Sequence, residues 1–100
     1  MTQQLSWQVT VTTAGTAVQA SAKSTIGGTF LVKADPDNTG SIFIGHDGAG
    51  DVSSTTGFEL DAGEQAVIDL PTLSKLWVDS SVNGEKAHVL LMTAFDKSVY

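Results

Sequence analysis

Residues 55–70 read TTGFELDAGEQAVIDL, and this stretch decides the fold class that the sequence predicts. Phe58 and Leu60 alternate with small or polar residues, and apolar residues resume over 66–70. Gly63 lies between the two runs, and glycine adopts the positive φ of a tight reversal without steric cost. The stretch therefore predicts two half-buried strands joined in a β-hairpin.

The rest of the chain repeats this pattern of short apolar runs separated by turn residues. The strictest alternation covers residues 5–12, and the turn and second run that follow predict another hairpin, from Trp7 to Ala22. Asn83-Gly84 is a dipeptide suited to a type I′ turn. Further strands are predicted at 30–34, 42–44, 76–78 and 87–94, with burial of both faces over 89–92, and one helical turn is predicted at 71–74.

These segments amount to about eight short strands, at the spacing typical of sandwiches and barrels. We therefore predict an all-β fold, an antiparallel β-sandwich for which the jelly roll is one arrangement. A chain of 100 residues corresponds to one domain. The predicted organisation is an N-terminal arm at 1–6, a single sandwich domain at 7–94 and a C-terminal tail at 95–100.

The composition argues against several classes of partner. Eleven acids oppose five lysines, arginine is absent, and the formal net charge is −6. Arginine is the preferred bidentate reader of phosphate and guanine, so no nucleic-acid partner is expected. The acidic balance and the lack of an apolar run of ~20 residues argue against a membrane partner. Without cysteine, the chain forms no disulfide and is compatible with folding in a reducing cytoplasm.

Two stretches imitate chemical sites. Residues 35–40, DPDNTG, resemble the start of a calcium loop, but the twelfth position, which needs a bidentate acid, is His46. An Asx turn is therefore the expected structure there. His46, Asp47 and Asp51 offer metal ligands or an acid and base, yet the other histidine, His88, lies inside a predicted strand. The two histidines are distant in the sequence and lack a defined third ligand, and no Gly-x-Ser-x-Gly elbow is present. We therefore expect no catalytic residue, no metal and no cofactor.

Turn motifs recur in a fixed relation to the predicted strands. Asn38-Thr39-Gly40 leads into an apolar run ending at Gly45, a loop follows, and Thr56-Gly57 with Gly63-Glu64 opens the next hairpin. The motifs at 9–11 and 14–19, and at 76–78 before 83–84, complete the pattern. From Trp7 onward, the chain resembles small β proteins of tailed bacteriophages.

The resemblance implies a non-enzymatic virion structural protein, made in the host cytoplasm and incorporated into the virion. Its members are similar to head-decoration (cement) proteins, which bind the major capsid protein or other virion proteins and act as homo-oligomers, often trimers. No catalytic residue comes with the resemblance. Contacts are expected at exposed loops and at the termini, and Trp7 is either a contact anchor or a core residue. The interface candidates are Trp7, His46, Asp47, Asp51, Val82, Asn83 and Tyr100.

Two alternatives remain open from the sequence. One is a neck, tail or fibre-associated module that binds another virion protein or a host glycan. The other is a small cupin-like enzyme or metal protein, which needs several inward-facing His and Glu residues. The chain offers few ligands for this second alternative, because it has two histidines and its glutamates lie in or beside apparent turns.

Overall fold

The computed structural model describes residues 6–21, 27–45, 52 and 57–94. Eight β-strands make up most of this part of the chain, which contains no α-helix. A 3₁₀ turn, η2 (Leu73–Lys75), lies close to the predicted helical turn. The strands are β1 (Ser6–Val11), β2 (Val18–Gln19), β3 (Gly28–Ala34), β4 (Ile42–Gly45), β5 (Phe58–Leu60), β6 (Gln65–Leu70), β7 (Trp77–Ser80) and β8 (Glu85–Ala94).

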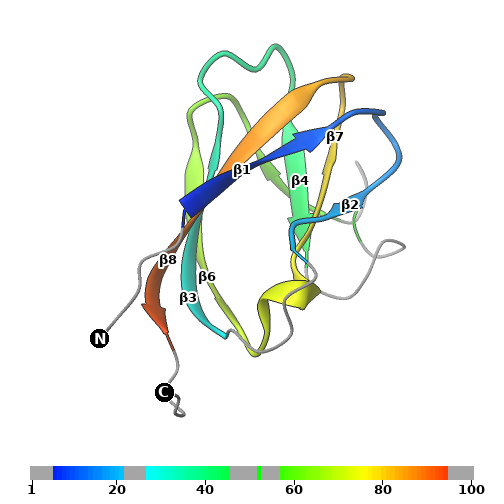
Figure 1. The fold of residues 1–100 in the computed structure, drawn as a ribbon. Coiled ribbons are helices and arrows are strands. Elements are labelled where there is room, and N and C mark those ends of the chain that lie inside the picture. Colours follow the sequence, from blue (N-terminus) through cyan, green and yellow to red (C-terminus); the bar gives the residue numbers. More distant parts are fainter. Residues whose placement is uncertain (1–5, 22–26, 46–51, 53–56, 95–100) are drawn as a thin grey trace.

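The strands form two four-stranded antiparallel sheets that face each other as two layers (Figure 1). Sheet 1 has the order β1-β8-β3-β6, and sheet 2 has the order β2-β7-β4-β5. The predicted all-β antiparallel sandwich is therefore confirmed. β1 begins at Ser6, which pairs with Leu90, so the strand starts one residue inside the predicted arm.

The strand pairing is that of a jelly roll. β1 pairs with β8, β2 with β7, β3 with β6 and β4 with β5, all antiparallel. This nesting corresponds to one long two-stranded ribbon with β4 and β5 at its tip. Wrapping the ribbon brings β3 beside β8 and β4 beside β7, which closes the two sheets.

Both predicted hairpins are wrong. β5 and β6 lie in different sheets, and so do β1 and β2. The turn between β5 and β6 does form: the N–H of Glu64 donates to the carbonyl of Asp61 at 2.8 Å, and Gly63 has a φ of 83°. Turn residues fix where the chain reverses, but they leave open which sheet receives the next strand. The Asn83-Gly84 turn likewise joins β7 of sheet 2 to β8 of sheet 1.

The core lies between the sheets and is built from alternate residues of each strand. Phe30, Val32 and Ala34 of β3 are fully buried, while the residues between them are half-buried. Ile42 and Val78 pack into the same cluster from sheet 2. The other buried members of the cluster are Val9, Val11, Ile44, Leu60, Leu70, Leu73, Leu76, Ala87, Val89 and Leu91.

The prediction that residues 89–92 are buried on both faces is wrong. Val89 and Leu91 are buried, whereas Leu90 is half-buried and Met92 is 48% exposed. β8 lies inside sheet 1, so its second face belongs to the outer surface of a two-layer fold. These apolar side chains therefore sit on the outside of the sandwich.

Candidate contact surface

The outer face of sheet 1 carries a row of apolar side chains that crosses three strands. Leu90 of β8 lies opposite Leu31 of β3, and Leu31 lies opposite Val67 of β6. Val67 is 57% exposed. A register shift in the β3–β8 ladder leaves Met92 without a partner in β3, at the end of this row. Contiguous exposed apolar residues of this kind mark contact sites on protein surfaces.

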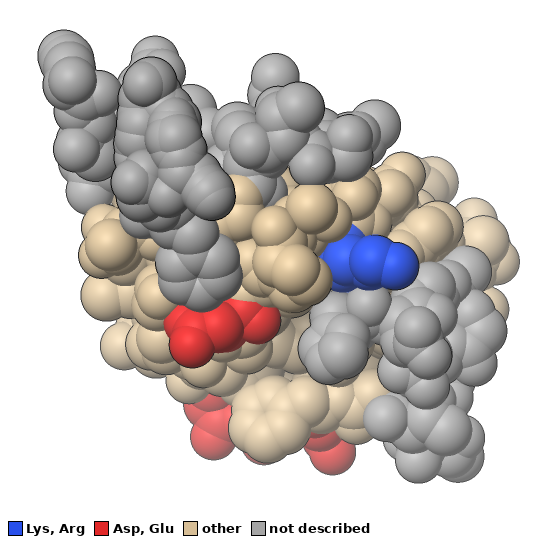
Figure 2. Space-filling view, turned by 90° about the horizontal axis from the view of Figure 1, so that it is seen from below, with Lys and Arg blue, Asp and Glu red and all other residues tan. Residues whose placement is uncertain are grey.

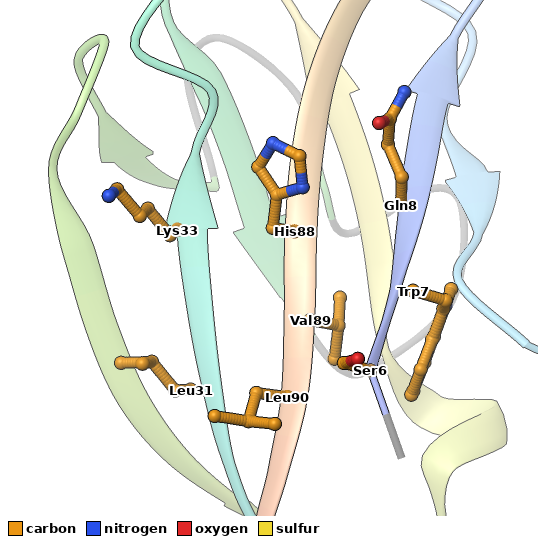
Figure 3. A pocket seen from close by; sticks show the side chains of 8 residues that line it. All are labelled: Ser6, Trp7, Gln8, Leu31, Lys33, His88, Val89 and Leu90. Carbon is orange, nitrogen blue, oxygen red and sulfur yellow. The ribbon is translucent and has the colours of Figure 1, made fainter.

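A polar row runs beside the apolar one. Gln8 of β1 lies opposite His88 of β8, which lies opposite Lys33 of β3. Figure 3 shows these three side chains next to one another, with Leu31 and Leu90 beyond them. Together they line an open hollow of about 450 Å³. We call this hollow and the apolar row the outer sheet-1 face.

His88 is held in place by Asp35, which follows β3. The Nε2 atom of His88 lies 2.8 Å from Oδ2 of Asp35. The N–H of Asp37 donates to Oδ1 of the same carboxylate at 2.8 Å, which closes an Asx turn. These two contacts, the Asp37 N–H first and His88 second, hold the pKa of Asp35 below its usual value. The expected Asx turn is therefore confirmed, and its carboxylate fixes the polar end of the hollow.

The side chain of Glu85 binds the backbone N–H groups at the other end of the Asp35–Gly40 loop. Its side chain is buried, and it accepts hydrogen bonds from the backbone N–H groups of Thr39 and Gly40. The loop thus closes on a carboxylate of its own chain. Among the residues that the structure describes, no group of three His, Cys, Asp or Glu side chains is arranged to hold a metal ion.

Three of the seven interface candidates lie in the described part of the chain. Trp7 is half-buried, packs against the core, and donates from its Nε1 to the carbonyl of Ala20 at 3.2 Å. Val82 is 40% exposed, and the exposed Asn83 accepts a hydrogen bond at Oδ1 from the N–H of Ala14 at 2.7 Å. Trp7 lies near the start of β1, whereas Val82 and Asn83 lie near its end, so the fold separates them.

The remaining candidates fall outside the described residues. They are His46, Asp47, Asp51 and Tyr100. The His46–Asp47–Asp51 combination considered from the sequence is therefore not described either. His88, which the structure describes, pairs with Asp35 on the outer sheet-1 face.

A second, smaller hollow lies at the side of the sandwich where β5 and β6 are the edge strands of their sheets. It has a volume of about 290 Å³ and is lined by apolar residues of β4, β5 and β6. Phe58 of β5 is 61% exposed beside it. This side of the molecule therefore also presents apolar surface to its surroundings.

Sequence reasoning missed the outer sheet-1 face, although one signal for it was present. The apolar run of β8 includes Leu90 and Met92, which a one-sided sandwich strand would replace with polar residues. Reading the run as doubly buried concealed an exposed apolar face. Lys33 and Gln8 offered no signal, because alternating polar residues are normal on a solvated face.

Charged side chains do not gather into a broad patch in the view of Figure 2. Acidic and basic groups appear there in small, separate places, and uncharged residues make up most of the described surface that this view shows. No helix among the described residues has the length and apolar character needed to cross a membrane. Comparisons with protein-family models, curated proteins and solved structures found no match.

Proposed function

We propose that this chain is a non-enzymatic structural protein of a bacteriophage virion, and specifically a capsid decoration protein. The proposal joins the resemblance of its turn motifs to the character of its surface. A jelly roll by itself does not choose this function, because the fold also serves lectins and cupins. The choice depends on the surface of the sandwich.

The observation that carries the proposal is the outer sheet-1 face. Leu31, Leu90 and Val67 form one row on rigid strands, and Met92 extends it. In the neighbouring polar row, His88 already bonds to Asp35. An apolar row with few free polar groups suits burial against another protein better than it suits a reaction.

A decoration protein stabilises a shell by touching several of its subunits. Each contact is small, but copies linked to one another and to the shell engage at high effective concentration. Weak individual contacts then hold collectively. The partners in this proposal are the major capsid protein and other copies of the chain, with a trimer as the assembly that the resemblance implies.

A neck, tail or fibre-associated module is the second candidate. The hollow favours it, because Gln8, Lys33 and His88 border an apolar floor made by Leu31 and Leu90 (Figure 3). A depression with an apolar floor and a few polar groups suits a small ligand such as a host glycan.

The test mixes the full chain with expanded, undecorated heads of the phage that encodes it. Stoichiometric binding and a raised melting temperature of the heads are expected. The double variant Leu31→Gln/Leu90→Gln should lose this binding while keeping its own melting temperature within a few degrees. The matched control is Thr10→Gln. Thr10 is an exposed residue of β1, two positions beyond Gln8, and it does not line the hollow.

Wild-type chain that leaves the heads unbound contradicts the decoration role. Saturable binding to tails or to a glycan array, lost in the same double variant, supports the second candidate instead. Equal binding by the double variant and the wild type would show that the outer sheet-1 face is not the contact.

A further inference from the structure

β6 is an edge strand with little of the usual protection of an edge, since Asp69 is its one charged residue. It spans six residues, and among the described strands its only partner is β3. Proteins shield such edges with short strands, lysine, proline or bulges. β6 contains no lysine, proline or glycine, and its ladder with β3 runs from Gly28–Leu70 to Lys33–Gln65 without a register shift.

The register shows which backbone groups point away from the sheet. The N–H of Ala34 donates to the carbonyl of Glu64 at 2.8 Å, so this pair is a hydrogen-bonded one. Hydrogen-bonded and non-hydrogen-bonded pairs alternate along an antiparallel ladder. The N–H and carbonyl groups of Gln65, Val67 and Asp69 therefore point outward from the edge of β6.

The same three residues place their side chains on the outer sheet-1 face. Val67, in the middle, is 57% exposed. Asp69 already accepts a hydrogen bond from the hydroxyl of Thr29 at 2.7 Å. Phe58, at the edge of the facing sheet, is 61% exposed. The edge thus offers free backbone groups together with apolar side chains.

We propose that two copies of the chain join by pairing β6 with β6 in antiparallel orientation, about a two-fold axis at Val67. Val67 then lies opposite Val67 of the other copy, and Gln65 lies opposite Asp69. The register makes about six backbone hydrogen bonds across the axis. It places an amide opposite a carboxylate on both sides of an apolar pair, with no like charges facing each other.

Self-complementarity is the reason to choose a second copy as the partner. A two-fold contact uses the same patch on both molecules, and β6 matches itself in hydrogen bonding, polarity and shape. The apolar row of Leu90, Leu31 and Val67 would then continue without a break into the second molecule. The other edges suit this less: β5 has three residues, β2 has two, and the outer face of β1 is polar.

This inference does not rest on the virion role. A two-fold contact produces an even number of copies, a dimer by itself or a hexamer where it joins two trimers. A trimer without this contact would leave the proposed function standing and overturn the pairing. A dimer that fails to bind phage heads would do the reverse.

The test measures the mass of the full chain by sedimentation from micromolar to millimolar concentration. Val67→Lys puts two lysines face to face across the axis and should raise the dimer dissociation constant by about 100-fold. Val67 is exposed, so the single copy should keep its stability. Thr12→Lys, an exposed position just past β1 at the opposite edge, is the matched control and should leave the dissociation constant unchanged.

Gln65→Glu should change the dimer dissociation constant and the stability of the single copy in different ways. Within one copy Gln65 lies opposite Lys33, so a glutamate there gains an attractive neighbour. Across the axis it would face Asp69 of the other copy and be repelled. The dissociation constant should rise about tenfold, less in high salt, while the melting temperature of the single copy stays the same or rises.

Hydrogen exchange locates the contact. The amides of Gln65, Val67 and Asp69 should gain protection as concentration rises, whereas the outward amides of β1 should not. A chain that stays monomeric at millimolar concentration overturns the proposal. So does an odd copy number, or association that Val67→Lys leaves intact.

Discussion

Two buried carboxylates, those of Asp79 and Glu85, accept hydrogen bonds from backbone N–H groups in the connections between the two sheets. Asp79 of β7 is 2% exposed, and its Oδ1 accepts from the N–H of Gly15 at 2.9 Å and of Ser80 at 2.8 Å. Glu85 does the same for the loop at 39–40. Because a jelly roll sends its chain repeatedly from one sheet to the other, each crossing takes backbone donors out of the sheet ladders, and those that are buried need other partners.

Replacing Asp79 by alanine should destabilise the fold strongly. The buried N–H of Ser80 would lose its side-chain partner, and so would the exposed N–H of Gly15, at a cost of about 1–3 kcal/mol in the free energy of unfolding. Asp79→Asn keeps an oxygen at the same position and should cost clearly less. Urea unfolding of the two variants measures the difference. Equal losses would show that packing around Asp79, rather than its hydrogen bonds, stabilises the β1–β2 turn.

Asp35 should make the stability of the chain depend on acid pH. Its pKa is lowered in the fold by the N–H of Asp37 and then by His88. The ionised carboxylate therefore stabilises the fold above the unfolded-state pKa of about 3.9, and this stabilisation is lost as the pH falls through the lower folded-state pKa. Asp35→Asn should thus be less stable than wild type at pH near neutral, with the gap narrowing in acid.

Urea midpoints of wild type and Asp35→Asn at neutral pH, near pH 4 and below pH 3 measure this gap. A gap that stays constant over that range would mean that the ionisation of Asp35 does not contribute, and that the asparagine only disturbs the Asx turn.

At the level of elements, the close approach of two chain segments fixes the entry to β3. A side chain at Gly27 would overlap the backbone carbonyl of Pro71, which follows β6. Gly63, by contrast, has open space around it and a φ of 83°. The two glycines are therefore needed for different reasons, one for space and the other for backbone conformation.

Gly27→Ala should cost more stability than Gly63→Ala. The first forces backbone apart and belongs at the upper end of the range of about 1–3 kcal/mol for overpacking. The second costs about 1 kcal/mol, the penalty of an L-residue in the left-handed region. Thermal and urea unfolding of both variants compare them. A harmless Gly27→Ala would show that the Pro71 carbonyl moves aside easily.

The elements, more than their partners, were predictable from the sequence. Alternation over 5–12 located β1, and alternation over 30–34 located β3. The turns at 13–16 and at Gly63 were located correctly but taken for hairpins, because a local turn carries no information about which sheet the next strand joins. Which sheet a strand joins is decided by how its apolar side chains are buried, and this burial depends on residues far away in the chain.

The contact surface was less predictable than the fold. Sequence reasoning favoured exposed loops, and four of its seven interface candidates lie outside the described residues. The outer sheet-1 face is assembled from residues on β1, β8, β3 and β6, which are neighbours only after the ribbon has wrapped. Leu31 and Val67 are 36 positions apart in the sequence, yet they face each other across one ladder.

For the whole molecule, the nested pairing means that contacts are made between distant parts of the chain. Of all consecutive strands described, only β4 and β5 are neighbours in a sheet, and they are joined by a long connection at 46–57. The outermost pair, β1 with β8, joins the beginning of the described chain to its end. Such a topology closes large loops before their contacts stabilise them, which slows folding.

We therefore expect refolding in milliseconds to seconds, as in other sandwiches dominated by distant pairings, and a single cooperative transition. The two tryptophans report on different sheets, since Trp7 lies in β1 and Trp77 in β7. Stopped-flow fluorescence of Trp7→Phe and Trp77→Phe isolates each signal in turn. Once corrected for the stability of each variant, the two rates should coincide, because neither sheet buries its inner face without the other. A fast phase seen through Trp77 alone would instead mean that β7 docks on β4 first and that sheet 2 forms as a separate unit.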